Sequence, residues 1–583
     1  MRNPDGAAVA VLPEPGTGRW LRFRGPVRVV EARRLSEVAA CVAAIEQSAR
    51  DGLHVAAFFA YEAAPAFDPA LAAHPPGGGP LAWAAAFRRA EPFALPVPPD
   101  ETPRPDWRPA ITRERYLAGW RRIRAGLAAG DTYQVNYTFP LAADFDAPAW
   151  PLFLAMQQAQ CAPWAAFVET AGFAVCSASP ELFFRLADGR LASRPMKGTA
   201  ARRPSYHDDE EAARALQRSE KNRAENVMIV DMIRNDMGRI ARPGSVAVTD
   251  LFRVERYPTV HQMTSTVTAC TAAGFGDVMR ALFPCASITG APKVHTTQII
   301  REVEPGPRGL YTGAIGHVTP GGAAWFNVAI RTVFVDKARR RAVYGVGGGV
   351  VWDSEPEQEY EECLLKARVL TARRPPFELL ETLLWEPETG YFLLRRHLER
   401  MRNSARYFGY AVDTERIAEN LLKRAGGFAA QPHRVRVLAA ADGSRRIEPA
   451  VFTPAPGRTW RVALAPGPVD ASDCFLYHKT THRTVYETMR NAVPDANDVI
   501  LWNEAGEVTE SSIANVVVQR GGIRYTPPVK CGLLAGVYRD TLVETGEMQE
   551  RVITRDELRS AEALFLINSV RKWMPAVLEE GRR

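Results

Sequence analysis

The segment GVGGGVVWDSEPEQEYEECLLKARVL, residues 345–370, decides the fold of the larger part of the chain. A strand pattern with three consecutive glycines runs into a turn, and a helical pattern follows directly. Ser354 fits the N-cap of this helix because Glu357 stands three residues later, the spacing of a capping box. A strand, a turn and a capped helix in succession predict a mixed α/β fold.

Charged side chains gather on one face of this predicted helix. Glu359, Glu362 and Lys366 are spaced i, i+3 and i+7, so they share a face. The other face is apolar and is expected to join the core through Leu364, Ala367 and Leu370. A solvated face would explain the charges equally well. The preceding glycines, however, are expected to form a loop with free backbone N–H groups, and such a loop can bind an anion. The combination suggests an anionic ligand bridged to a divalent metal.

A second helical pattern, SEKNRAENVMIVDMIRND at residues 219–236, places Glu225 ahead of an apolar stripe. A glutamate in this position can interact with the helix dipole. It can equally supply an oxygen ligand to Mg²⁺, which proteins usually hold with one or two carboxylates, substrate and water. Spacing alone leaves both roles open.

Two proline-rich stretches divide the chain. Residues 91–109 contain seven prolines, which exclude a helix or a central strand and indicate an extended connector. Pro375 and Pro376 follow a long helical pattern and mark the main boundary. We therefore expect two unlike α/β (α+β) units, residues 1–372 and 377–583. The first would contain an N-terminal subdomain at 1–105 and a core at 110–372.

Composition excludes several classes of protein. The 583 residues are 46% hydrophobic and 24% charged, which rules out disordered, collagen-like and coiled-coil chains. The 73 basic and 66 acidic residues leave a charge of +7 that is spread along the chain, so no nucleic-acid partner is predicted. No apolar run is long enough for a membrane helix, and the start has no signal-peptide core. Eight cysteines without a C-x-x-C pair disfavour zinc ribbons and disulfide scaffolds. We expect a cytoplasmic enzyme.

Motifs along residues 110–372 resemble the chorismate-utilising enzymes, a group that includes anthranilate, isochorismate, salicylate and aminodeoxychorismate synthases. They occur in unbroken order: GDTYQVNYTFP, SASPELFF, PMKGT, AENVMIVDMIRND, GAPKV, YTGAIG, FNVAIRT and the segment quoted above. The resemblance implies a β-sandwich core with surrounding helices, and Mg²⁺ and chorismate as ligands.

The resemblance also implies residue roles. Glu225 and Glu362 resemble the Mg²⁺ ligands, with Glu359 beside them, and Glu181 resembles the general acid that assists departure of the C4 hydroxyl. An arginine fork suits a carboxylate. The implied substrate contacts are Thr199, Tyr311, Arg331, Gly347, Gly348, Gly349 and Lys366.

Two positions select a reaction within the group. Lys197 stands where anthranilate synthases typically carry alanine, and in aminodeoxychorismate synthases the matching lysine resembles a nucleophile that attacks C2 of chorismate. Such a lysine needs a lowered pKa; it could otherwise be a counter-ion for a carboxylate. Gln134 stands where the water-adding members carry a lysine base, which ammonia does not need. Gln262 replaces a histidine typical of anthranilate synthases, with His261 one position away, so no catalytic role is given to His261.

The second unit resembles the fold-type IV pyridoxal-phosphate enzymes, which include transaminases and aminodeoxychorismate lyase. The motifs are HLERMRNSA, HKTTHR, GEVTESSIAN, YTPPVKCGLLAGVYR and INSVRKWMP. The resemblance implies that Lys479 binds the cofactor covalently and moves the substrate proton, and that Glu510 pairs with the pyridine nitrogen. The implied phosphate ligands are Arg400, Gly536 and Val537, and Ser512 and Asn515 would also line the site.

Together the resemblances imply a bifunctional enzyme of 4-aminobenzoate synthesis on the route to folate. The first unit would convert chorismate and ammonia to 4-amino-4-deoxychorismate, and the second would eliminate pyruvate. No glutaminase signature occurs in the sequence, so a separate glutamine amidotransferase subunit is expected. The alternatives are an anthranilate- or isochorismate-type synthase joined to a branched-chain or D-amino-acid transaminase, and a binding protein with degenerate sites.

Overall fold

The computed structural model describes residues 8–99, 101–372, 375–455 and 457–579. The first seven residues, where the absence of a signal peptide was predicted, and Arg373 and Arg374 at the predicted boundary lie outside the described residues. The chain forms two compact units. One comprises Met1–Ala201 and Arg214–Arg374, the other Arg202–Ala213 and Pro375–Arg583.

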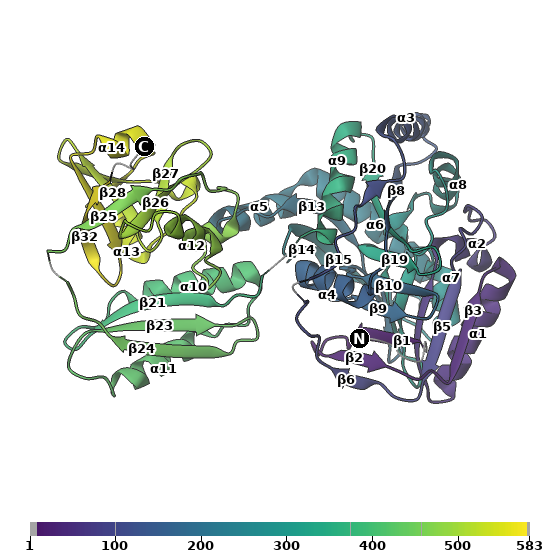
Figure 1. Cartoon of the computed structure of the whole chain (residues 1–583). Helices are drawn as coiled ribbons and strands as arrows, with labels where there is room; N and C mark the ends of the chain where they lie inside the picture. Colours follow the sequence, from purple (N-terminus) through teal and green to yellow (C-terminus); the bar gives the residue numbers. More distant parts are fainter. Residues whose placement is uncertain (1–7, 100, 373–374, 456, 580–583) are drawn as a thin grey trace. The chain divides into compact units, whose positions relative to one another are not determined.

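The first unit is a β-sandwich with helices on both outer faces, as predicted (Figure 1). Its described residues form two ten-stranded sheets. The first sheet has the order β16 (Gly290–Ala291), β8 (Gln134–Asp144), β20 (Arg341–Val350), β19 (Thr332–Asp336), β10 (Phe173–Ser177), β9 (Ala166–Glu169), β1 (Val9–Pro13), β2 (Trp20–Phe23) and β6 (Glu91–Phe93), with β7 (Arg108–Pro109) paired to β8.

The second sheet completes the sandwich. Its order is β13 (Met196–Ala201), β15 (Val260–Cys270), β12 (Arg190–Arg194), β11 (Leu182–Ala187), β18 (Ala324–Val328), β17 (Ala314–Val318), β4 (His54–Phe59), β5 (Ala82–Phe87) and β3 (Arg28–Ala32), with β14 (Ala247–Arg256) paired to β15. Strands from the N-terminal segment 8–93 therefore extend both sheets. The connector at 91–109 contributes only the short strands β6 and β7, as its prolines require.

The core has three layers, because successive side chains of each strand point to opposite faces of its sheet. In β4, Ala56 and Phe58 face the interior between the sheets, whereas Val55 and Phe59 face a helical layer. The helices α1 (Leu35–Arg50), α6 (Glu220–Gly238) and α7 (Phe275–Leu282) cover the second sheet. The helices α3 (Arg113–Ala129), α4 (Ala149–Gln160), α8 (Lys293–Val303) and α9 (Pro356–Lys366) cover the first. Leu364 packs against this core, as predicted for the apolar face of α9.

The second unit contains a small sheet and a closed ring of strands. The small sheet has the order β22 (Gly390–Tyr391), β21 (Leu379–Glu386), β23 (His433–Ala439) and β24 (Arg445–Val451), and α10 (Leu394–Phe408) and α11 (Thr414–Ala425) pack on one of its faces. The ring runs β27 (Val508–Ser511), β26 (Asp498–Trp502), β25 (Trp460–Leu464), β32 (Lys572–Leu578), β31 (Ala563–Asn568) and β28 (Asn515–Arg520), which returns to β27. Outside the ring, β29 (Ile523–Thr526) and β30 (Gln549–Glu550) continue from β28.

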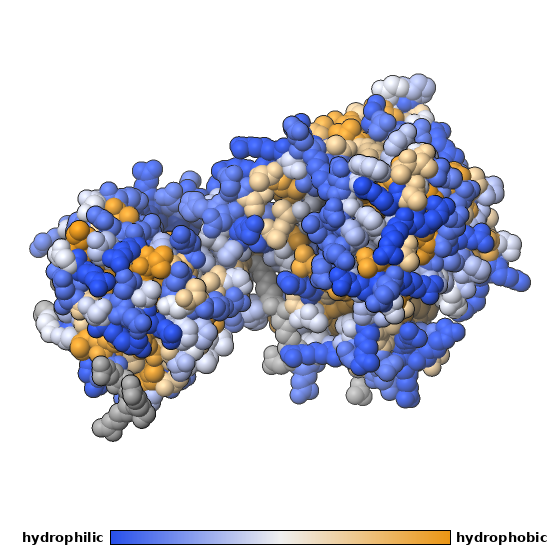
Figure 2. Space-filling model, turned by 90° about the horizontal axis from the view of Figure 1, so that it is seen from above, coloured by the Kyte–Doolittle hydropathy of each residue, from blue (hydrophilic) through white to orange (hydrophobic). Residues whose placement is uncertain are grey.

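One segment was not anticipated from the sequence. Residues 202–213, which include the start of α5 (Tyr206–Arg218), belong to the second unit although they lie far from it in the chain. Arg202 forms a buried ion pair with Asp209 at 2.7 Å and donates to the carbonyl of Tyr407 at 2.9 Å. On the face shown in Figure 2 most side chains are hydrophilic, and no described helix is long and apolar enough to span a bilayer.

Candidate functional site

The first unit contains a cavity of about 270 Å³ that brings together most of the predicted site residues. The predicted residues that line it are Glu181, Lys197, Thr199, Glu225, Tyr311, Arg331, Gly347, Gly349, Glu359, Glu362 and Lys366. They come from β13, β20, α6, α9 and the loops beside them. Gln134 and Gly348 do not line the cavity directly.

The glycines at 347–349 form part of strand β20, so the predicted loop is wrong. They pair with Thr138, Tyr137 and Asn136 of β8. A residue in an antiparallel strand directs its N–H and C=O to the same side. The carbonyl of Gly347 accepts from Lys366 Nζ at 2.8 Å, so the backbone groups of Gly347 point away from β8. Gly347 and Gly349 can therefore offer N–H groups to an anion, whereas Gly348 cannot.

A bulge in β13 presents Lys197 to the cavity. The β13–β15 register shifts between Met196 and Thr199, and Gly198 has φ +96°, a value that favours glycine. Gln262 fixes the bulge: its Nε2 donates to the Gly198 carbonyl at 3.1 Å. The Thr199 hydroxyl donates to Gln262 Oε1 at 3.2 Å. The residue that replaces the histidine of anthranilate synthases thus supports the segment that carries Lys197.

Lys197 and Gln134 meet at Gly349. A Cβ on residue 349 would lie 2.2 Å from Lys197 Nζ and 3.0 Å from Gln134 Nε2. Burial lowers the pKa of Lys197, which increases the fraction of free amine. The buried Gln134 amide has no hydrogen-bond partner among the described residues.

Glu181 is a buried acid with one strong partner. Ser287 Oγ donates to Glu181 Oε1 at 2.6 Å. Burial raises the pKa of Glu181 to about 7, and the Ser287 hydrogen bond opposes that rise. A carboxyl group with this pKa can be protonated near neutral pH, as a general acid requires. Ser287 lies in the short 3-10 helix Ala286–Ile288, and a single serine there carries no spacing signal in the sequence.

The acidic face of α9 forms as predicted, but its cap differs. Glu355 is the N-cap, and the Ser354 hydroxyl instead donates to Glu359 Oε1 at 2.7 Å. Lys366 and Glu362 form an ion pair at 2.8 Å, which lowers the pKa of Glu362. Burial raises the pKa of Glu359. The predicted capping box is therefore wrong, because Ser354 contacts a carboxylate one turn further along.

Arg331 and Tyr311 also line this cavity. Arg331 has φ +52° and donates from Nη1 to Gln160 Oε1 at 2.9 Å, which leaves other guanidinium N–H groups for a substrate carboxylate. The Tyr311 ring packs against Gly345, where a Cβ would lie 2.0 Å from the ring. Gln160 is a positioning residue that the sequence did not reveal.

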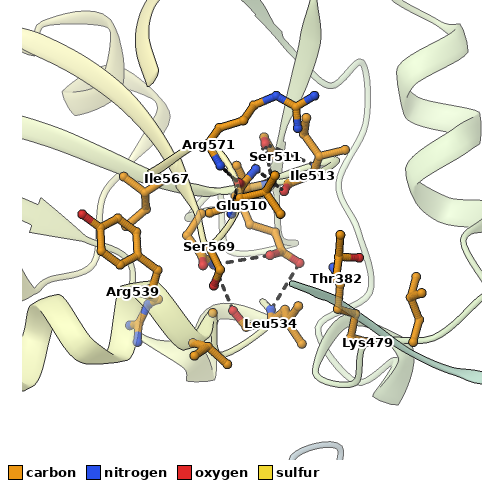
Figure 3. A pocket seen from close by; sticks show the side chains of 18 of the residues that line it. Thr382, Lys479, Glu510, Ser511, Ile513, Leu534, Arg539, Ile567, Ser569 and Arg571 are labelled. Carbon is orange, nitrogen blue, oxygen red and sulfur yellow. Dashed lines mark hydrogen bonds between the residues drawn. The ribbon is translucent and has the colours of Figure 1, made fainter. Parts of the chain in front are cut away.

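The second unit contains a cavity of about 420 Å³ that holds Lys479 and Glu510 (Figure 3). Burial, with the nearby Arg400, lowers the pKa of Lys479 to about 8. Burial raises the pKa of Glu510 to about 7. Glu510 accepts hydrogen bonds from the Tyr486 hydroxyl at 2.7 Å and the Leu534 N–H at 3.2 Å. A lysine amine and a carboxylate thus share one buried site.

Arg400 is held by a carboxylate that sequence reasoning missed. Its Nε and Nη2 donate to Glu381 at 2.9 and 2.8 Å, and its Nη1 donates to the Ala535 carbonyl at 2.9 Å. His397 shares Glu381 at 2.7 Å. Burial would raise the pKa of Glu381, but Arg400 and His397 outweigh it and lower the pKa to about 2. Two guanidinium N–H groups of Arg400 remain available.

The helix α13 (Val537–Glu544) begins at this cavity, with Gly536 as its N-cap. A Cβ on residue 536 would lie 1.9 Å from Asn515 Oδ1, so only glycine fits there. Unpaired N–H groups at a helix N-terminus bind phosphate. Ser512 and Asn515 line the same cavity.

Comparison with known proteins divides the chain near residue 375, as the structure does for all but residues 202–213. Residues 92–372 match the family described as chorismate binding enzyme, and residues 378–578 match amino-transferase class IV. Residues 92–372 are called the chorismate-binding domain below and residues 378–578 the class IV domain, after the families that they match.

Named relatives match the chorismate-binding domain. Aminodeoxychorismate synthase of Streptomyces griseus is 47% identical over 261 residues, which are 44% of this chain and 36% of that protein. Aminodeoxychorismate synthase component 1 of Escherichia coli strain K12 is 41% identical over 263 residues, which are 45% of this chain and 58% of that protein. The chain thus spans between 36% and 58% of the length of these relatives.

A solved structure supports the fold of this domain. Anthranilate synthase component I of Streptococcus pneumoniae superposes with a TM-score of 0.52 and 20% identity, over 64% of this chain and 94% of that one. The predicted sandwich fold is therefore confirmed.

The side chains that line the two cavities fit Mg²⁺ and pyridoxal phosphate, the ligands that the resemblances imply. In the described residues, no three Asp, Glu, His or Cys side chains form a ready-made metal cluster. Glu225, Glu359 and Glu362 nevertheless face one cavity, and hard oxygen donors completed by substrate and water fit Mg²⁺. In the class IV domain, Lys479, Glu510 and the glycine-capped start of α13 fit the aldehyde, the ring nitrogen and the phosphate of pyridoxal phosphate.

Proposed function

We propose that residues 1–372 aminate chorismate at C4 with ammonia and give 4-amino-4-deoxychorismate. The observation that carries this proposal is the half-buried Lys197, which shares a cavity with Glu181 and whose amine meets the Gln134 amide at Gly349. The relatives named aminodeoxychorismate synthase support the same reaction.

In this proposal each step is assigned to a residue of the cavity. The Lys197 amine attacks C2 of chorismate, and Glu181 donates a proton to the C4 hydroxyl, which leaves as water. Ammonia then forms a bond to C4, the bond between C2 and Lys197 breaks, and the lysine leaves as an amine. Arg331 and the N–H groups of Gly347 and Gly349 hold the carboxylates.

The remaining residues of the cavity would assist binding. Mg²⁺ would be held by Glu225 and Glu362 beside Glu359, and would neutralise a substrate carboxylate. Tyr311 would pack against the substrate, and Thr199 and Lys366 would contact it. The Gln134 amide cannot act as a base that activates water. Ammonia needs no such base and is therefore the proposed nucleophile.

We propose that residues 377–583 convert this product to 4-aminobenzoate by eliminating pyruvate. Pyridoxal phosphate would supply an electron sink for the carbon that loses its proton. Lys479 takes the proton from C4 because its pKa of about 8 leaves a substantial fraction of free amine. The C3–O bond then breaks, enolpyruvate leaves and takes up a proton, and the ring becomes aromatic.

The phosphate and the ring of the cofactor each have residues to hold them. Arg400, Gly536 and Val537 would hold the phosphate, and Glu510 would pair with the pyridine nitrogen. Amino-acid transamination is the alternative reaction for this domain, because the same residues would serve either reaction.

A single assay tests both proposals. The full chain is supplied with chorismate, ammonium, Mg²⁺ and pyridoxal phosphate, and the products are separated by chromatography. Wild type should give 4-aminobenzoate and pyruvate, and Lys479→Ala should stop at aminodeoxychorismate. Lys197→Ala should lose the first step. Anthranilate or isochorismate as product would refute the first assignment, and accumulation of aminodeoxychorismate by wild type would refute the second.

We also propose that a separate glutamine amidotransferase subunit supplies the ammonia. The designation "component 1" of the Escherichia coli relative supports a second component. The purified chain should then use ammonium but not glutamine. Glutamine-dependent turnover by the chain alone would overturn this proposal.

A further inference from the structure

The cavity of the class IV domain carries far more positive charge than the proposed cofactor needs. Its lining contains one acidic residue, Glu510, beside Lys479. It also contains six arginines: Arg400, Arg434, Arg436, Arg483, Arg539 and Arg571. Such an excess of cations in a cavity attracts an anion with more than one charge.

Four of these arginines already have partners. Arg400 pairs with Glu381, and Arg539 pairs with Asp540 and Glu550. Arg436 lies 3.4 Å from Glu448, and Arg483 donates to the Ser512 carbonyl. These four guanidinium groups therefore already form ion pairs or hydrogen bonds within the domain.

Arg434 and Arg571, like Arg483, have no carboxylate partner in the described part of the chain, and the Arg571 guanidinium lies 5.8 Å from the Trp460 ring. Unlike Arg483, neither Arg434 nor Arg571 donates a side-chain hydrogen bond to another described residue that would hold it within the domain. The two guanidinium groups lie close enough to interact electrostatically, because burial and then the charge of Arg434 lower the pKa of Arg571. Two arginines that face one cavity without counter-charges repel each other, so a ligand with negative charge would relieve the repulsion.

The fold directs Arg434 into the cavity. Along β23, Val435 and Val437 pack against the helical layer, so the alternate residues Arg434 and Arg436 point to the opposite face. On β21 the same alternation places Leu380 and Thr382 on the cavity side.

A tight turn positions Arg571. It lies in the turn between β31 and β32, where Asn568 Oδ1 accepts the N–H groups of Val570 at 3.1 Å and Arg571 at 2.8 Å. Lys572, the next residue, has φ +57°. Figure 3 shows Arg571 over the same cavity as Glu510 and Ser511.

We infer that Arg434 and Arg571 determine specificity by binding the two carboxylates of a cyclic dicarboxylate substrate. This inference rests on the proposed function, because aminodeoxychorismate carries one carboxylate on the ring and one on the enolpyruvyl ether. The proposed phosphate ligands are the start of α13 and Arg400, so these two arginines remain for the substrate. A monocarboxylate amino acid would leave one of them without a counter-charge.

The test uses the full chain with Lys197→Ala, loaded with pyridoxal phosphate, and supplied with preformed aminodeoxychorismate. Arg434→Gln or Arg571→Gln should raise KM about 10- to 100-fold, because each removes a charge-assisted hydrogen bond. The visible absorption of the bound cofactor should be unchanged, and Arg434→Lys should restore part of the loss. Arg445→Gln, on the neighbouring strand β24 and outside the cavity, is the matched control.

Inhibition provides a second readout. Chorismate has both carboxylates but no amine, so it should compete for this site, and benzoate should compete at least tenfold less well. Arg571→Gln should remove the difference. Equal inhibition by both compounds, or an unchanged KM in both glutamine variants, would overturn the inference. No 4-aminobenzoate from wild type would instead refute the proposed function itself.

Discussion

The amine of Lys197 lies 2.2 Å from the position that a Cβ on residue 349 would occupy. Gly349 belongs to β20 and Lys197 to β13, which are strands of different sheets. The missing side chain of Gly349 is therefore the space in which the amine sits. One residue in one sheet thus sets the position of the proposed nucleophile in the other.

This relationship predicts the effect of Gly349→Ala. The added methyl group should displace the Lys197 amine and lower the rate of aminodeoxychorismate formation at least 100-fold, since misplacement of about 1 Å can have this effect. Formation of 4-aminobenzoate from preformed aminodeoxychorismate should not change. Gly172→Ala, where a Cβ would meet nothing within 4 Å, should leave both rates unchanged. Retention of the first step in Gly349→Ala would contradict the assigned geometry.

Ser287→Ala should shift the pH dependence of the first step. Glu181 must be protonated to donate, so the rate should fall as pH rises through its pKa of about 7. The Ser287 hydrogen bond lowers that pKa, so its removal should move the alkaline limb of kcat/KM to higher pH. The profile of chorismate consumption measures the shift. A limb that moves to lower pH would rule out Glu181 as the acid.

Tyr486→Phe should impair only the class IV domain. The Tyr486 hydroxyl lowers the pKa of Glu510, so its loss should favour the protonated carboxyl and weaken the proposed pairing with the cofactor ring. We expect the rate of 4-aminobenzoate formation from preformed aminodeoxychorismate to fall about tenfold, the effect of roughly 1.4 kcal/mol on a barrier. Ammonium-dependent formation of aminodeoxychorismate is the internal control, and its loss would indicate a general folding defect.

Glu381→Gln should destabilise the class IV domain. It leaves the buried Arg400 without its counter-charge, which costs roughly 3–5 kcal/mol in such pairs. The folded pKa of Glu381, about 2, lies below the ordinary glutamate value of 4.5, so its stabilising contribution is present above pH 4.5 and is lost as pH falls toward 2. The thermal midpoint of wild type should therefore fall with acidification, and less so in the variant.

The matched control for this prediction is Glu544→Gln. Glu544 pairs with Arg396 on the surface, where solvent screens the charges, so the thermal midpoint should hardly change. Equal effects of the two substitutions would show that burial does not decide the strength of the Glu381–Arg400 pair.

Local patterns predicted the elements of the fold well. Helical patterns placed α6 and α9, and prolines kept residues 91–109 to short edge strands. The patterns failed where local rules allow two outcomes. The glycines at 347–349 read as a loop but form a strand, because β8 supplies a partner from 200 residues earlier in the chain.

The sequence by itself determined which residues are assigned the proposed chemistry. Lys197, Glu181, Lys479 and Glu510 stand in motifs whose order and spacing are local properties of the chain. Only the tertiary structure decided which groups tune them. Ser287 reaches Glu181 across 106 positions, and Glu381 reaches Arg400 from another element. Burial and long-range hydrogen bonds shift a pKa only after distant segments have packed together, so no local pattern of residues encodes these partners.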